Sequence, residues 1–204
     1  MIKIIAAFVF AFIFVGGANS QDLSLREQII LKNVLAHHKN NLECDGRGSD
    51  KESSLFIRFK KNSDFETDTI VIPVSCSFHA YQVSWVAYST PDDGRNDTEI
   101  SILSFPSTND GKQWIASTFL MSPNWEPETQ TLSTFYKGRG IADCGGYDSF
   151  KWNGYSFYLS SANYQTCCWN EASFEKNPEC KKIKGKYPLP IDDWPLVFSY
   201  KSKK

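Results

Sequence analysis

The sequence predicts an α+β domain that is mainly antiparallel β sheet, carries one N-terminal helix and is stapled by disulfides. Three observations support this class. A capping-box pattern opens one helical segment, many short strand-like segments separated by turn residues follow it, and the chain contains six cysteines. These are Cys44, Cys76, Cys144, Cys167, Cys168 and Cys180.

The first 20 residues have the pattern of a secretory signal peptide. Lys3 is their one charged residue, an apolar run covers residues 4–15, and small residues follow that run. We expect cleavage after Ser20, with cleavage after Ala18 as the alternative. The apolar run is shorter than the roughly 20 residues of a membrane-spanning helix, so a retained anchor is the weaker interpretation. The mature chain is then one domain, residues 21–204, without a stable membrane span.

The charge balance argues against a polyanionic partner. The chain carries 22 basic and 23 acidic residues, so it has no basic field suited to nucleic acid or to anionic lipid. Its aromatic content is high, with six tryptophans, nine tyrosines and fifteen phenylalanines, which favours a β-rich core. We expect a monomer that binds no nucleic acid.

One helix is expected, over residues 25–40. Ser24 and Glu27 have the spacing of a capping box, which satisfies the first free N–H groups of a helix. His37 and His38 fall in the last turn, where a positive charge is favourable. Adjacent helical residues point in different directions, so we interpret the two histidines as a helix end rather than as metal ligands.

The remainder of the chain changes to the two-residue period of β-strands. Asn109-Asp110-Gly111 and Asn153-Gly154 are typical hairpin turns. We interpret the lysine-rich segment Lys176–Lys186 as a solvated loop held by Cys180. The expected strands are 55–59, 67–75, 80–89, 98–105, 113–121, 130–136, 149–152 and 155–159, with an edge strand at 194–200.

An even number of cysteines behind an export signal indicates disulfides formed in an oxidising compartment. A zinc site is the weaker, second interpretation. Structural zinc sites usually contain C-x-x-C pairs, and the chain has none. Cys167 and Cys168 are not expected to bond to each other, since adjacent Cα atoms are about 3.8 Å apart and disulfides need about 4.4 Å or more. Cys144 is a natural partner for one of them. Cys180 could take the other or pair with Cys44 or Cys76, and the connectivity stays open.

The most distinctive segment is residues 137–146, which contains four glycines. Arg139 and Asp143 can pair across this turn, and Cys144 can anchor it. The favoured interpretation is structural, a pinned corner that sets the register of the next hairpin. The alternative is a backbone nest in which Arg139 captures a carboxylate or another anion. The candidate ligand-binding residues are Arg139, Asp143, Tyr147 and Trp152.

Several short motifs occur in a specific order between residues 68 and 168. They are Ile72-Pro73-Val74-Ser75-Cys76, Trp125-Glu126-Pro127-Glu128-Thr129, Leu132-Ser133-Thr134-Phe135, the Arg139–Gly145 loop, Trp152-Asn153-Gly154 and Cys167-Cys168. In these motifs the chain resembles the exported bacterial domain-of-unknown-function 1176 family. The resemblance implies a location in a Gram-negative cell envelope and implies no known reaction.

The expected location is the periplasm, with secretion as the alternative. The first function hypothesis is a non-enzymatic binding or inhibitor module whose partner is an envelope protein or a cell-wall component. The second is a cell-envelope hydrolase that uses Asp143 and a second carboxylate, and the third is a purely structural envelope protein. The further catalytic candidates are Asp148, Asp192 with Asp193, and His79. No G-x-S-x-G or H-E-x-x-H motif occurs, so we do not expect catalysis, a cofactor or a metal.

Overall fold

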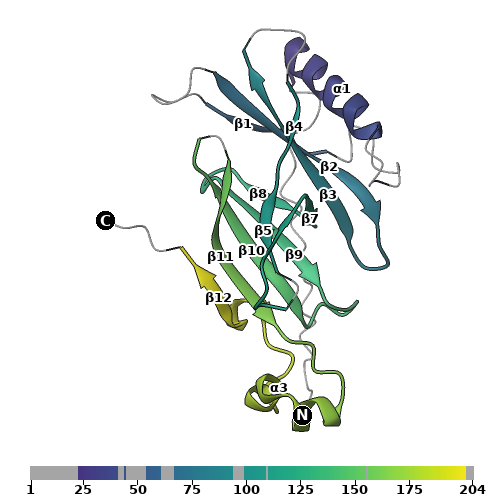
Figure 1. Cartoon of the computed structure of the whole chain (residues 1–204), viewed down its shortest axis with the longest axis vertical. Helices are drawn as coiled ribbons and strands as arrows, with labels where there is room; N and C mark the ends of the chain where they lie inside the picture. The colour runs from purple at the N-terminus through teal and green to yellow at the C-terminus, as the bar shows by residue number, and fades with distance from the viewer. Residues whose placement is uncertain are drawn as a thin grey trace, which may run out of the picture.

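The computed structural model describes residues 23–40, 44, 54–60, 67–93, 99–108, 110–154 and 156–200. The expected signal peptide with both cleavage positions lies outside these residues. Within the described residues the fold is α+β, as predicted: helix α1 (Leu25–Lys39) covers one antiparallel sheet, and a second antiparallel sheet packs on the other face of the first (Figure 1).

The capping box at the start of α1 is formed as predicted. The Ser24 hydroxyl accepts a hydrogen bond from the backbone N–H of Glu27, and the Glu27 carboxylate accepts one from the backbone N–H of Ser24. The helix buries Ile30, Leu31 and Val34 against the first sheet. These three side chains recur at helical spacing, so they form the apolar face of α1.

The C-terminal turn of α1 differs from the prediction at His38. This side chain is 1% exposed, and its ring nitrogens contact the Tyr88 hydroxyl at 2.8 Å and the Ser75 carbonyl oxygen at 2.9 Å. A carbonyl can only accept, so Nε2 donates to Ser75 and Nδ1 accepts from Tyr88. Burial lowers the pKa of His38 below 6.5, and the side chain is therefore a neutral core residue rather than a cation at a helix end.

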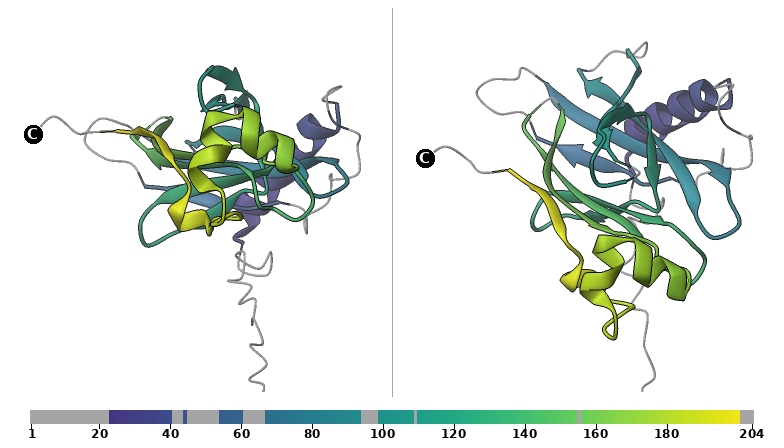
Figure 2. Two further views of the ribbon diagram at one scale, coloured as in Figure 1. Left: turned by 90° about the horizontal axis from the view of Figure 1, so that it is seen from below. Right: turned by 60° about the horizontal axis from the view of Figure 1, so that its bottom comes forward.

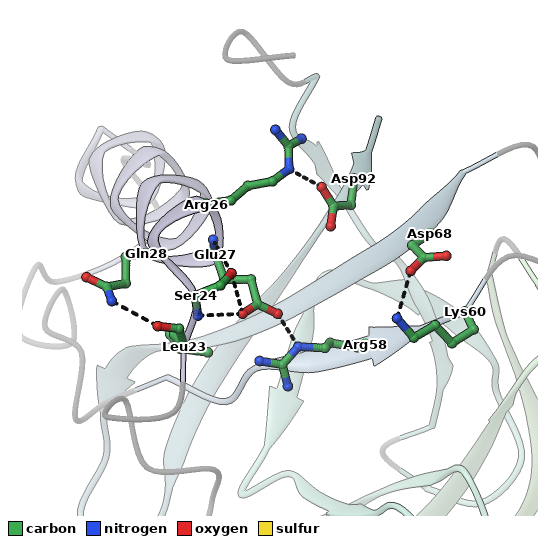
Figure 3. A network of polar contacts seen from close by, with 9 residues as sticks. All are labelled: Leu23, Ser24, Arg26, Glu27, Gln28, Arg58, Lys60, Asp68 and Asp92. Carbon is green, nitrogen blue, oxygen red and sulfur yellow. Dashed lines mark hydrogen bonds and ion pairs between the residues drawn. The ribbon is translucent and has the colours of Figure 1, made fainter. Parts of the chain in front are cut away.

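Ion pairs fix α1 to the first sheet at the start of the helix (Figure 3). Arg26 pairs with Asp92, and Arg58 pairs with Glu27. The hydrogen bond from Arg58 holds the pKa of Glu27 down at about 2, against a smaller opposing effect of burial. These contacts join residues that are far apart in the sequence, and they orient α1 across the sheet.

The first sheet is built around a long hairpin. Its strands run in the order β1-β2-β3-β4, all antiparallel, and β7 also pairs with β3. A bulge interrupts the hairpin between Ser75 and Ser77. The strands are β1 (Ile57–Phe59), β2 (Asp68–Phe78), β3 (Val83–Asp92), β4 (Ser101–Ile102) and β7 (Phe119–Met121).

The second sheet has the order β12-β11-β10-β9-β8, and β12 lies at its edge as predicted. Its strands are β8 (Asn124–Glu126), β9 (Thr131–Lys137), β10 (Gly145–Trp152), β11 (Phe157–Gln165) and β12 (Leu196–Ser199). The sequence did not predict β8, which has three residues and pairs only with β9 among the described strands. A strand this short carries too little alternation to be recognised.

Two expected strands are each split in the structure. The segments expected at 98–105 and 113–121 contribute β4 and β7 to the first sheet, while β5 (Phe105–Ser107) and β6 (Ile115–Ser117) form a separate hairpin. The predicted turn lies between β5 and β6, where the Asp110 carboxylate accepts hydrogen bonds from the N–H groups of Lys112 and Gln113. Asn109 of this turn lies outside the described residues.

Two hydrophobic cores separate the three layers. Alternate residues of β2 face opposite ways, so Ile70, Ile72 and Val74 pack toward α1 while Val71 packs toward the second sheet. The core between the sheets is rich in aromatic rings. Its rings include Phe59, Phe105, Phe150, Phe157, Trp125 and Trp152.

The prediction of a loop over Lys176–Lys186 is wrong, because this region contains helix. Two short helices, α2 (Glu171–Lys176) and α3 (Pro178–Ile183), lie at the end of the molecule opposite α1 (Figures 1 and 2). Asn170 and Asn177 cap them, and Pro178 occupies the first turn of α3. A short 3-10 helix, η3 (Ile191–Asp193), leads into β12.

All six cysteines form disulfides, so the zinc interpretation is wrong. The pairs are Cys44–Cys76, Cys144–Cys167 and Cys168–Cys180, with Cα separations of 4.7, 5.0 and 5.8 Å. The expectation that Cys167 and Cys168 take different partners is confirmed, as is Cys144 as a partner of one of them. Two of the three bridges lie close to the Gly-rich loop and the C-terminal helices.

Candidate functional site

The loop between β9 and β10 is closed by its own backbone. The N–H of Gly138 donates to the Cys144 carbonyl at 2.8 Å, and the N–H of Ala142 donates to the Arg139 carbonyl at 3.0 Å. The Cys144–Cys167 disulfide lies directly over Gly138, where a Cβ atom would be 2.5 Å from the Cys167 sulfur. This close approach explains a glycine at position 138 and pins the loop to the segment after β11.

Arg139 and Asp143 form the predicted ion pair. The Arg139 Nε–H donates to Asp143 Oδ1 at 2.6 Å, and Nη2 donates to Oδ2. The Asp143 carboxylate is buried, and the hydrogen bond from Arg139 lowers its pKa below 3.8 although burial opposes this shift. The same hydrogen bond raises the pKa of Arg139. Both groups therefore stay charged and satisfy each other at neutral pH.

The C-terminal segment closes around the Arg139 side chain. The guanidinium carbon lies 5.0 Å from the Trp169 ring centre and 5.8 Å from that of Tyr187. Nη2 also donates to the Tyr187 hydroxyl at 2.9 Å, and burial is the main cause of the raised pKa of Tyr187. Arg139 thus connects the Gly-rich loop to the residues before α2 and after α3.

This geometry bears on the two interpretations of the loop. Both carboxylate oxygens of Asp143 accept hydrogen bonds from Arg139, so the guanidinium already has an internal counter-ion. An external anion would have to compete with a bidentate pair. The structural interpretation of this pair is therefore the stronger one, and a ligand would more readily contact the surface around the pair than the pair itself.

That surface carries three exposed apolar side chains, which we name the loop patch: Tyr81, Ile141 and Trp169. Their exposed fractions are 62%, 74% and 62%. Tyr81, on the β2–β3 turn, packs against the Gly140 backbone, where a Cβ atom would be 2.8 Å from the Tyr81 ring. Ile141 follows Gly140 in the loop, and the ring of Trp169 lies over Arg139. The patch therefore joins three segments that are distant in the sequence.

The β2–β3 turn is fixed in this position by a second contact. The Gln82 side-chain oxygen accepts a hydrogen bond from the backbone N–H of Lys137 at 2.8 Å. Sequence reasoning missed all three residues of the loop patch. Ile141, an apolar residue inside a Gly-rich turn, was the one available signal, because such turns are commonly polar.

The structure does not bring Tyr147 and Trp152 together with Arg139. Tyr147 is half-buried on β10, opposite Phe135 on β9 and Asn163 on β11. Trp152 ends β10 at the far end from the loop, and its ring stacks on Phe59 at 4.3 Å between centroids. Trp152 is therefore part of the core between the sheets.

The catalytic candidates are also dispersed. Asp148 is buried on β10 opposite Thr134 and Ala162, and burial raises its pKa to about 7. Asp192 and Asp193 are exposed in η3, and His79 is exposed at the β2–β3 turn.

Within the described ranges, no group of three or more His, Cys, Asp or Glu side chains is arranged to hold a metal ion. Among those same residues, no helix has the length and apolarity needed to cross a membrane.

The fold and the site define a disulfide-stapled α+β domain that carries a rigid, partly apolar loop surface. Three disulfides are typical of a protein that folds outside the cytoplasm. The chain belongs to the family described as "Protein of unknown function (DUF1176)", whose model matches residues 15–187. This match extends the resemblance seen over residues 68–168 in both directions. No curated protein and no solved structure matches the chain.

Proposed function

We propose that this protein is a periplasmic, non-enzymatic binding module that recognises an envelope protein through the loop patch. The observation that carries the proposal is the exposure of Tyr81, Ile141 and Trp169 around one rigid loop. Exposed apolar side chains that are gathered at one place on a soluble domain mark interaction surfaces more often than single exposed residues do. Tryptophan and tyrosine are also the residue types enriched at binding hot spots.

The rigidity of the loop supports the same function. The Cys144–Cys167 bridge, the Arg139–Asp143 pair and the contact of Tyr81 with Gly140 hold the patch in one conformation. A preorganised surface loses little conformational entropy when it binds, which raises its affinity. Rigid disulfide-pinned loops are suited to inhibitors as well as to other binding modules, so inhibition of an envelope enzyme is one form of this function.

Site-specific photo-crosslinking tests the proposal in the intact envelope. A benzophenone side chain replaces Ile141 in one variant and Leu25 in a control. Leu25 is 76% exposed at the start of α1, next to Arg26, and Arg26 pairs with Asp92 at the end of β3 that lies away from the β2–β3 turn. We expect a discrete protein adduct from position 141 and none from position 25. Equal labelling from positions 141 and 25 overturns the proposal. A further variant carries the benzophenone at Trp169, and the proposal is also overturned if neither position 141 nor position 169 gives an adduct.

A hydrolase is the second candidate function, and one observation favours it. Asp148 has a pKa of about 7 because it is buried, and a carboxylic acid with a pKa near the working pH is suited to general acid catalysis. Asp143, the expected partner carboxylate, is bound by Arg139 and has a lowered pKa, so it is poorly placed to exchange protons. Loss of cell-wall hydrolysis in a folded Asp148→Asn variant is the result that supports this candidate.

A further inference from the structure

We infer that the loop patch takes a protein partner with an acidic surface around an apolar centre. This inference rests on the proposed binding function and adds the charge of the partner. The segment that carries Trp169 contains both the exposed indole of the patch and the most lysine-rich part of the described chain.

The segment from Trp169 to Tyr187 carries more positive than negative charge. It contains five lysines and three glutamates, and all five lysines are exposed. One of the glutamates, Glu179, is already engaged by the Lys112 ammonium at 3.4 Å and by the Thr166 hydroxyl. Glu171 and Glu175 of α2 remain as the opposing charges. The lysines are Lys176, Lys181, Lys182, Lys184 and Lys186.

The Cys168–Cys180 disulfide and the Arg139 contacts bring the backbone of two of these lysines near residues that surround the patch. Cys168 and Cys180 have their Cα atoms 5.8 Å apart, and Trp169 and Lys181 directly follow them. Their Cα atoms therefore lie within about 13 Å of each other, since consecutive Cα atoms are about 3.8 Å apart. Lys186 precedes Tyr187, whose hydroxyl accepts a hydrogen bond from Arg139.

Neither lysine is neutralised by the loop itself. The buried carboxylate of Asp143 is matched by Arg139, so this pair adds no net charge to the patch. Among the described residues, Lys181 and Lys186 form no ion pair. The segment that carries Trp169 therefore combines an exposed indole with an excess of positive charge, although the exposed Glu171 is two residues from Trp169. An apolar centre with charges around it is the usual division between the core and the rim of a protein interface.

A protein partner fits this surface better than a polyanion. The whole chain has a net charge of -1, so it has no long-range positive field that attracts a membrane or a nucleic acid. Charges beside an apolar centre instead steer a partner of opposite local charge and suppress partners of like charge. The expected counterpart has one apolar side chain between carboxylates.

The test uses a synthetic glutamate-rich peptide with one central phenylalanine, titrated into the oxidised mature protein and followed through its tryptophan indole resonances. A peptide with glutamine in place of every glutamate is the neutral control. We expect the acidic peptide to bind at least about tenfold more tightly at low salt, with an advantage that shrinks as salt rises. Equal affinity of the two peptides, or no binding of either, overturns the inference.

Charge reversal separates this inference from the proposed function. The variant with both Lys181→Glu and Lys186→Glu is expected to bind the acidic peptide about tenfold more weakly and to lose most of the adduct from position 141. The control is Lys151→Glu, at an exposed position on β10, which should change neither the peptide affinity nor the adduct. An undiminished adduct in the reversed variant overturns the acidic partner and leaves the binding function standing. Absence of the adduct from the unreversed protein overturns both. Binding of phosphatidylglycerol vesicles in place of the peptide also overturns the inference, in favour of a lipid surface.

Discussion

The backbone of Gly145 lies against the carbonyl of Tyr136, so close that a Cβ atom on Gly145 would be 1.9 Å from the Tyr136 oxygen. Gly145 also has a φ of +135°, which L-residues rarely adopt. It is the first residue of β10 and directly follows the bridged Cys144. The Gly-rich loop can therefore close onto β9 only with glycine at this position.

Replacement of Gly145 tests this requirement. We expect Gly145→Ala to lower the free energy of unfolding by about 3 kcal/mol or more, because the new methyl group meets backbone and the φ angle is strained. Gly146→Ala is the matched control, since a Cβ atom there has its nearest neighbours at 3.9 Å. Chemical denaturation of both variants measures the difference. Similar losses in the two variants contradict the structural account of the loop.

The Arg139–Asp143 pair predicts a pH-dependent loss of stability. The pKa of Asp143 is lowered in the folded protein, so its contribution is present above the unfolded value of 3.8 and is lost as the pH falls below that value. Asp143→Asn is expected to cost about 1–3 kcal/mol at pH 7, and the difference from wild type should narrow below about pH 4. Asp192→Asn, at an exposed position in η3, is the control and should show neither effect. If the difference in unfolding free energy between Asp143→Asn and wild type stays constant with pH, the ion pair does not stabilise the fold as described.

Asp148 is expected to show the opposite pH dependence. Its pKa is raised from 3.8 to about 7 by burial, so it destabilises the fold increasingly as the pH rises between these values. Asp148→Asn should therefore be more stable than wild type at pH 8, by on the order of 2 kcal/mol, and this advantage should be smaller at pH 5. Urea denaturation at the two pH values measures it. If the variant is less stable than wild type at pH 8, the carboxylate has a stabilising role that burial alone does not explain.

His38 predicts sensitivity to mild acid. Its folded pKa lies below the unfolded value of 6.5, so the protein should lose stability as the pH falls below 6.5. His38→Gln is expected to reduce this slope, while His37→Gln, at the exposed neighbouring position, should keep it. Because Asp148 acts in the opposite direction over part of this range, both variants are best compared in the Asp148→Asn background. Equal slopes in the two variants contradict the neutral, buried state of His38.

The elements that were predicted correctly are those with local signals. Ser24 and Glu27 lie three residues apart and form the capping box by themselves. The turn at Asp110 is likewise closed by contacts within a few residues.

The helices α2 and α3 were missed although they carried a local signal too, in Asn170 and in Asn177 followed by Pro178. That signal was outweighed by the lysine content, because charge was interpreted as solvation rather than as helix surface.

Of the candidate residues, the sequence related Arg139 and Asp143 to each other correctly. Arg139 and Asp143 are four residues apart, so one turn can bring them together, and the structure confirms the pair. The structure places Trp152 apart from them, against Phe59, since position on a strand does not reveal which core a side chain enters. Tyr81 and Trp169 come from the β2–β3 turn and from the segment after β11, and no local pattern relates either residue to the Gly-rich loop.

The sequence by itself determined the α+β class, the capped helix, the main hairpins and the separate partners of Cys167 and Cys168, because each depends on near neighbours in the chain. The tertiary structure alone decided the three disulfide pairs, the neutral state of His38 and the loop patch. Each of these depends on which distant segments the packing of two sheets and a helix brings together. Burial and contact set both the chemistry of a side chain and its exposure, and neither is encoded at a single position.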